Sequence, residues 1–297
     1  MRTGSQGRDE PRLHALELSV QSARNRLCVT RPESVEFVTT EPQLAFLDTV
    51  VTHANRFTIF GLQYKPYWIM SDFAMIAALI YVWAFSRHFP SVSELGLATA
   101  VLAALVIYKF VLELKAIFLK RAARSFLQDC LLVILPSFLG VSFLFGQPLS
   151  LALALLGTLM PLYGCFARIG CFLGGCCFGR PSVLGVHYPA SIFESTDHGC
   201  RRFSPSPNPG SRVFPIQLVE SAAQAVLFGT LVLVLWRIPN SASAIFWVYL
   251  SLYAIVRFIL DFYRTTGARP RYGRFSEAQL TCIAVQVVSL SVLIVRH

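Results

Sequence analysis

Residues 149–168 read LSLALALLGTLMPLYGCFAR, an apolar run that ends on an arginine. A helix of about 20 such residues is long enough to cross the hydrocarbon core of a bilayer. Similar apolar runs recur along the chain at 67–86, 95–114, 126–146, 217–236, 244–263 and 278–295. We therefore predict an all-α, polytopic membrane protein with about seven transmembrane helices.

The composition favours the same fold class. Of the 297 residues, 55% are hydrophobic and only 14% are charged, whereas an average soluble domain has about 25% charged residues. The net charge of +10 is expected from Lys and Arg in loops beside lipid headgroups. Because no Lys/Arg run with interleaved aromatic residues is present, we expect no nucleic-acid partner.

The first part of the chain has a different character. Residues 1–50 are rich in Arg, Glu, Ser and Thr, and they lack the apolar core of a cleavable signal peptide. We predict a polar N-terminal tail at 1–56 and a seven-helix transmembrane domain at 57–297.

The stretch that follows the quoted run, 168–180, reads RIGCFLGGCCFGR. A guanidinium keeps its charge in a protein, so Arg168 at a membrane boundary needs an anionic partner or a wet cavity. Gly170, Gly175 and Gly179 allow the backbone to turn sharply and to come close to a ligand. The stretch predicts a site for an anionic group.

Two further polar groups interrupt apolar sequence. Residues 215–220 read PIQLVE at the start of one apolar run. In a later run, Tyr253, Arg257, Asp261 and Arg264 share one helix face. Arg168 and Arg257 could converge on one phosphate, which guanidinium groups bind in bidentate fashion. The alternative is that Arg257 and Asp261 only pair with each other.

These motifs resemble the prolipoprotein diacylglyceryl transferase family in order and spacing. The stretch from Arg168 resembles the family's Gly-Arg-Ile-Gly-Asn-Phe-x-Asn-Gly-Glu-x-x-Gly, and FPIQLVE at 214–220 resembles His-Pro-Ser-Gln-Leu-Tyr-Glu. The face that begins at Tyr253 resembles Tyr-x-x-x-Arg-x-x-x-Glu-Phe-x-Arg, and 273–279 resembles the start of the family's last helix. The resemblance covers about 57–297.

The resemblance implies a transferase of the bacterial inner (plasma) membrane. The family moves the diacylglyceryl group of phosphatidylglycerol to the lipobox cysteine thiol of a prolipoprotein. The implied partners are phosphatidylglycerol, the signal-peptide region of a prolipoprotein and membrane lipids, and no cofactor is expected. By position, Arg168, Arg257 and Glu220 are expected to be catalytic. Substrate-binding residues are expected to be Gly170, Gly175, Gly179, Gln217, Tyr253, Asp261 and Arg264.

The chain departs from the family pattern at several positions. Cys171 and Cys176 replace the motif's Asn and Glu, and Phe214 replaces a histidine. Leu127 stands where the family has a histidine at the head of the third helix. Nearby Asp129 is a candidate base, because burial in lipid raises the pKa of a carboxyl group. These departures leave open a homologue that binds lipid but is inactive or uses another acceptor. A transporter or a thiol redox protein is the third alternative.

Cys171, Cys176 and Cys177 form a group in the glycine-rich stretch. Their spacing matches no common zinc pattern, so we expect buried thiols that pack beside glycine and no metal. A disulfide or a metal site would also be compatible with the motif.

Overall fold

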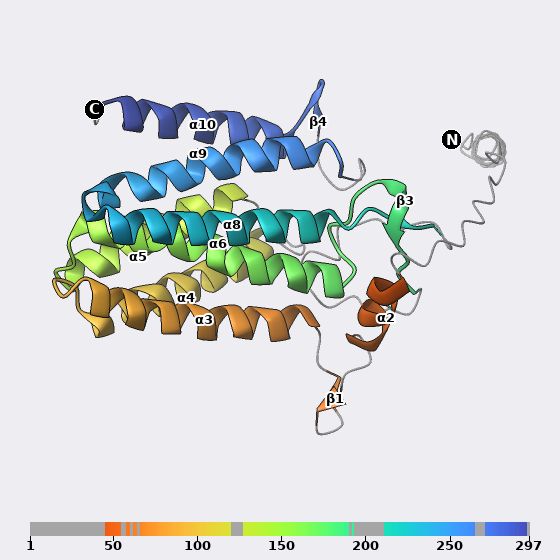
Figure 1. Cartoon of the computed structure of the whole chain (residues 1–297), viewed down its shortest axis with the longest axis horizontal. Coiled ribbons are helices and arrows are strands. Elements are labelled where there is room, and N and C mark those ends of the chain that lie inside the picture. The colour runs from red at the N-terminus through yellow and green to blue at the C-terminus, as the bar shows by residue number, and fades with distance from the viewer. Residues whose placement is uncertain are drawn as a thin grey trace, which may run out of the picture. The chain divides into compact units, whose positions relative to one another are not determined.

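A computed structural model gives the fold of the chain (Figure 1). It describes residues 45–54, 58–59, 62–63, 66–119, 127–189, 192, 211–264 and 271–295. All of these belong to one compact unit, Pro42–His297.

Long helices dominate the described residues. They are α3 (Pro66–His88), α4 (Glu94–Leu119), α5 (Leu127–Leu144), α6 (Leu149–Leu173), α8 (Ile216–Arg237), α9 (Ala242–Asp261) and α10 (Glu277–Val295). A short helix, α2 (Ala45–Ala54), precedes them, and a 3-10 turn (Pro239–Ser241) joins α8 to α9. The strands are β1 (Thr58–Ile59), β2 (Leu62–Gln63), β3 (Pro181–Val186), β4 (Arg271–Tyr272) and β5 (Phe275–Ser276).

The all-α polytopic prediction is confirmed. Six described helices are long and apolar enough to cross a membrane: α3, α4, α6, α8, α9 and α10. The one predicted span without a match among these six is 126–146, which corresponds to α5. Within α5, the apolar segment of described side chains is shorter, Leu131–Leu144. The chain is a multi-pass membrane protein, and the number of seven spans stays a prediction.

Helix α6 lies at the centre of the bundle and contacts α3, α5, α8 and α9 (Figure 1). Lipid is as apolar as a leucine side chain, so helices associate in a membrane through close packing at small residues rather than through hydrophobic burial. Gly157 of α6 lies directly against the backbone of Phe246 in α9. Gly164, seven residues later, lies against the Gln224 side chain of α8. The small residues of α6 therefore let two neighbouring helices approach it closely.

Gly157→Ala is expected to destabilise the bundle by about 1–3 kcal/mol. An added Cβ would lie 2.7 Å from the Cα of Phe246 and 2.9 Å from its amide nitrogen, and backbone atoms cannot move aside as a side chain can. Unfolding in mixed micelles, followed by circular dichroism, measures the effect. Gly229→Ala in α8 is the matched control, because nothing lies within 4 Å of its added Cβ. An equal loss in both variants would contradict the role of Gly157.

A second, smaller core lies at the end of the bundle where α2 and β3 lie (Figure 1). It consists of Val51, Phe172, Phe178, Val186, Tyr188, Ile192 and Val213. Asp48 of α2 fastens this region, because its carboxylate accepts a hydrogen bond from the backbone N–H of His187 at 2.8 Å and pairs with Arg212 at 2.9 Å. Helix α2 falls inside the predicted polar N-terminal tail, 1–56. The part of that tail before Ala45 lies outside the described residues.

Candidate functional site

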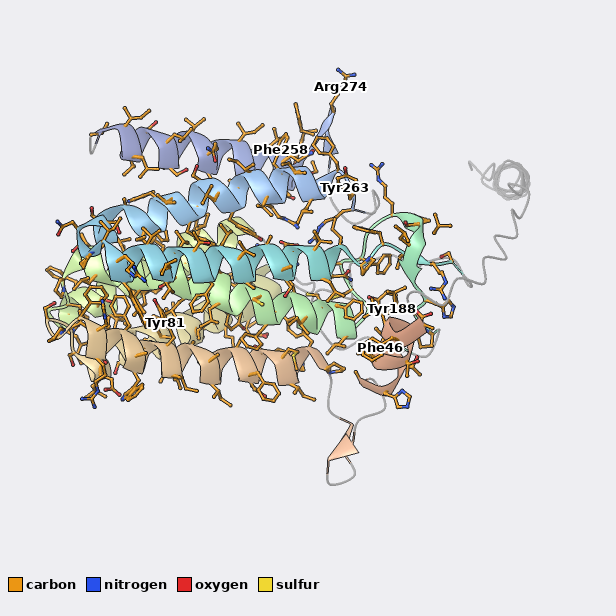
Figure 2. The ribbon with its side chains drawn as sticks, in the orientation of Figure 1. Phe46, Tyr81, Tyr188, Phe258, Tyr263 and Arg274 are labelled. Atoms are coloured by element: carbon orange, nitrogen blue, oxygen red, sulfur yellow. The ribbon has the colours of Figure 1, made fainter. Side chains whose placement is uncertain are left out.

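Four chain segments meet at the α2 end of the bundle. They are the C-terminal turn of α6, the first turns of α8, the last turns of α9 and the residues that follow α9. The turn after α6 is joined to the others by backbone hydrogen bonds, from Gly179 N–H to Phe214 O at 2.9 Å and from Arg180 N–H to Tyr263 O at 3.0 Å. Figure 2 shows Tyr263 and Tyr188 at this end and Tyr81 far along the bundle from it.

Glu220 is the centre of the site. Its side chain is fully buried, one turn into α8. Its carboxylate pairs with Arg168 Nε at 3.1 Å, with Arg257 Nη1 at 3.2 Å and with Arg264 Nη2. It also accepts a hydrogen bond from the Tyr253 hydroxyl at 2.8 Å. One carboxylate therefore joins three guanidinium groups from α6, α9 and the segment after α9.

Asp261 lies one helical turn after Arg257, on the same face of α9, as the sequence predicted. Its carboxylate is 3.8 Å from Arg257 Nη2 and accepts a hydrogen bond from the Ser276 hydroxyl. Ser276 in turn is held by Gln279, which accepts a hydrogen bond from the Ser276 backbone N–H at 3.0 Å. The Asp261 carboxylate is thus positioned by Ser276 of β5, directly before α10.

The cluster has an excess of positive charge. Three guanidinium groups, of Arg168, Arg257 and Arg264, face two carboxylates, of Glu220 and Asp261, which leaves one positive charge uncompensated among them. Burial lowers the pKa of the Arg264 guanidinium, but the groups around it, the negative charge of Glu220 foremost, together raise it by more. The pKa of Arg264 is therefore above its usual value. Arg264 Nε is buried and has no hydrogen-bond partner within the described part of the chain. Such a cluster can accept an anion.

Arg168 differs from the other two arginines in its exposure. Its side chain is 21% exposed, whereas those of Arg257 and Arg264 are 3% and 8% exposed. Arg168 is therefore the most accessible of the three guanidinium groups that pair with Glu220.

The other predicted site residues have contacts with the protein. Gln217 is fully buried and its Nε2 donates a hydrogen bond to Cys176 O at 2.8 Å. An added Cβ at Gly170 would lie 3.1 Å from Met70 Cβ of α3, and one at Gly179 would lie 2.8 Å from Phe214 O. Gly175 has φ +64° and packs against Ile192. At these glycines the backbone comes close to other parts of the protein. Contact of the glycines with substrate stays a prediction.

Asp129, the predicted base, lies in the first turn of α5, but its side chain lies outside the described residues. Its role stays a prediction.

Two contributors were missed by the sequence analysis. Ser276 orients Asp261, and Ser221, the residue after Glu220, donates a hydrogen bond to Cys165 O at 2.9 Å. Ser276 lies within the 273–279 stretch that resembles the family, but neither serine stood out, since a serine in an apolar helix or a short strand is common.

The chain is similar in sequence to known proteins. A model of the family described as prolipoprotein diacylglyceryl transferase matches residues 57–295. The chain is similar to the phosphatidylglycerol–prolipoprotein diacylglyceryl transferases of three bacteria. Identity is 32% over 101 residues for Clostridium tetani (33% of this chain, 35% of that protein). It is 26% over 142 residues for Chlorobaculum tepidum (46% and 43%) and 30% over 145 residues for Azoarcus sp. (46% and 48%). The matched segments thus span between a third and a half of these relatives.

Proposed function

Because the chain belongs to the prolipoprotein diacylglyceryl transferase family, we propose that it transfers the diacylglyceryl group of phosphatidylglycerol to a cysteine thiol in the signal-peptide region of a prolipoprotein. The proposal includes the inner (plasma) membrane as its location. The observation that carries it is the partly exposed Arg168 beside a buried cluster with one positive charge in excess.

The proposed reaction is an alkyl transfer to sulfur. The acceptor thiolate attacks the glyceryl carbon that bears the phosphate, a C–S bond forms, and the C–O bond to the phosphate breaks. Glycerol phosphate leaves with the electron pair of that bond, and the thiol proton passes to a base. Charge that develops on the leaving phosphate has to be stabilised, and preorganised guanidinium groups do this well.

Each named residue has a separate part in this scheme. Arg168 binds the phosphate, and Arg257 and Arg264 add positive charge behind it. Glu220 is assigned a positioning role, because its oxygens are occupied by three guanidinium groups and by Tyr253. Asp129 stays the candidate base that receives the thiol proton.

The second candidate is a family member that binds phosphatidylglycerol and uses another acceptor or has no transfer activity. It is favoured by the changed motif positions, where Cys171, Cys176, Phe214 and Leu127 stand in place of Asn, Glu and two histidines.

A transfer assay distinguishes the two candidates. Purified full-length protein in phosphatidylglycerol micelles, labelled in the acyl chains, is incubated with a lipobox peptide or with the same peptide carrying Ser in place of Cys. We expect label on the Cys peptide alone. Binding of labelled lipid without transfer, together with failure to rescue a strain that lacks its own transferase, would refute the first proposal and favour the second.

A further inference from the structure

Three thiols converge where α6 ends, one from its last turn and two from the turn that follows it. Gly175 and Cys177 both adopt positive φ, +64° and +59°, and this folds the chain back on itself. The backbone N–H of Cys176 then donates a hydrogen bond to Cys171 O at 3.0 Å. As a result the Sγ atoms of Cys171, Cys176 and Cys177 all lie within 4.8 Å of one another. The spacing of the three cysteines in the sequence did not predict that their sulfur atoms would come together.

The turn is held in this shape from several sides. Gln217 binds Cys176 O from α8, and the Tyr188 hydroxyl donates a hydrogen bond to Phe172 O at 3.0 Å. Burial raises the pKa of Tyr188, so this tyrosine remains a neutral donor. Cys177 is the one residue other than glycine with positive φ in the part of the chain that the structure describes. Such a conformation is strained and persists only where its surroundings enforce it.

The arrangement has the size and the chemistry of a metal site. Zinc–sulfur bonds of about 2.3 Å set tetrahedral thiolates about 3.8 Å apart, so each sulfur would move by less than an ångström to bind one ion. Three sulfur donors exclude hard cations such as Mg²⁺ and Ca²⁺ and favour Zn²⁺ or Cu⁺. Cys171 and Cys176 are buried and Cys177 is half-buried, so a bound ion would be largely shielded from water.

The neighbouring charges fit such an ion. Arg168 interacts electrostatically with Cys171 and Cys177, and Arg264 interacts with Cys177. Nearby cations favour the thiolate form of cysteine. Three thiolates around Zn²⁺ carry one net negative charge, which the nearby guanidinium groups of Arg168 and Arg264 stabilise.

We propose that Cys171, Cys176 and Cys177 form a binding site for one thiophilic metal ion, Zn²⁺ or Cu⁺, with one coordination position left open. Binding of Zn²⁺ releases the three thiol protons and leaves a trithiolate complex. The ion would tie the last turn of α6 to the segment that leads to Gly179 and Arg180, and would thereby fix Arg168 relative to its neighbours.

Metal analysis of the full-length protein tests the site. The protein is purified under reducing conditions without a histidine tag, loaded separately with Zn²⁺ and with Cu⁺, dialysed, and analysed by elemental mass spectrometry. We expect about one ion per chain, and the two loading arms show which metal is retained. In Cys177→Ser we expect metal affinity to fall by more than tenfold. Cys282→Ser is the matched control, because Cys282 is a buried thiol of α10 outside the group.

Two readouts on the unmodified chain keep the test independent of variant folding. Replacement of Zn²⁺ by Co²⁺ should give thiolate-to-cobalt charge-transfer absorption, which Zn²⁺ then removes. Native alkylation should spare the half-buried Cys177 in the metal-loaded protein and modify it after chelation. Absence of stoichiometric metal with unchanged alkylation, or a disulfide between two of the three cysteines in the protein as isolated, would overturn the proposal.

Discussion

Replacing Arg168 by alanine is expected to lower the rate of diacylglyceryl transfer by about 10²–10³-fold, the usual cost of removing one preorganised donor to a developing anion. Arg168 is the most exposed of the three guanidinium groups on Glu220. Its loss removes the contact nearest to the phosphate and leaves the carboxylate paired with the two other arginines. The fold should therefore survive, and the transfer assay with labelled phosphatidylglycerol measures the effect directly.

Two further variants sharpen this prediction. Arg168→Lys keeps the positive charge but loses the planar, bidentate geometry, so we expect only partial activity. Arg237→Ala, an exposed arginine at the far end of α8, should retain the wild-type rate. Near-normal activity in Arg168→Ala would mean that the phosphate is bound elsewhere.

Replacing Glu220 by alanine is expected to destabilise the folded protein by about 3–5 kcal/mol, the usual cost of removing one partner from a buried ion pair. The side chain of Glu220 is fully buried and compensates Arg168, Arg257 and Arg264 at once. Its loss leaves these three cations with one carboxylate of the cluster, that of Asp261, to compensate them. Unfolding in mixed micelles should show the loss, and Glu94→Ala, at the exposed start of α4, should cost less than about 1 kcal/mol.

A second substitution identifies the cause of that loss. If repulsion among uncompensated arginines destabilises Glu220→Ala, then adding Arg264→Met should restore part of the stability, because the double change removes one buried cation. Glu220→Gln, which keeps the shape but not the charge, provides a milder variant should Glu220→Ala fail to fold. Additive losses in the double variant would contradict an electrostatic role for Glu220.

The sequence predicted those parts of the site that depend on helix geometry. Tyr253, Arg257 and Asp261 repeat every four residues on α9, so a shared face follows from helical periodicity alone. The resemblance to the family led us to expect Arg168, Arg257 and Glu220 in one site, without giving their contacts. The sharing of Glu220 by Arg264 was not expected, because Arg264 lies beyond the last residue of α9 and its direction depends on how the chain leaves that helix.

Backbone conformation limits what could be predicted elsewhere. The convergence of the three cysteines depends on a left-handed conformation at Cys177, which sequence patterns rarely predict for a residue with a side chain. Helix α2 is short and lies in a polar stretch, and it is held by the Asp48 carboxylate and by the burial of Val51. Nothing near Asp48 in the sequence indicates a partner more than a hundred residues away.

The bond between Asp48 and Arg212 has a consequence for biosynthesis. The two residues are 164 positions apart. At synthesis rates of about 5–20 residues per second, Arg212 emerges from the ribosome about 8–33 seconds after Asp48. Four of the long helices, α3 to α6, are made in that interval. Helix α2 therefore gains its anchoring partner only after these helices have been translated, and the end of the bundle that holds the arginine cluster is completed late in synthesis.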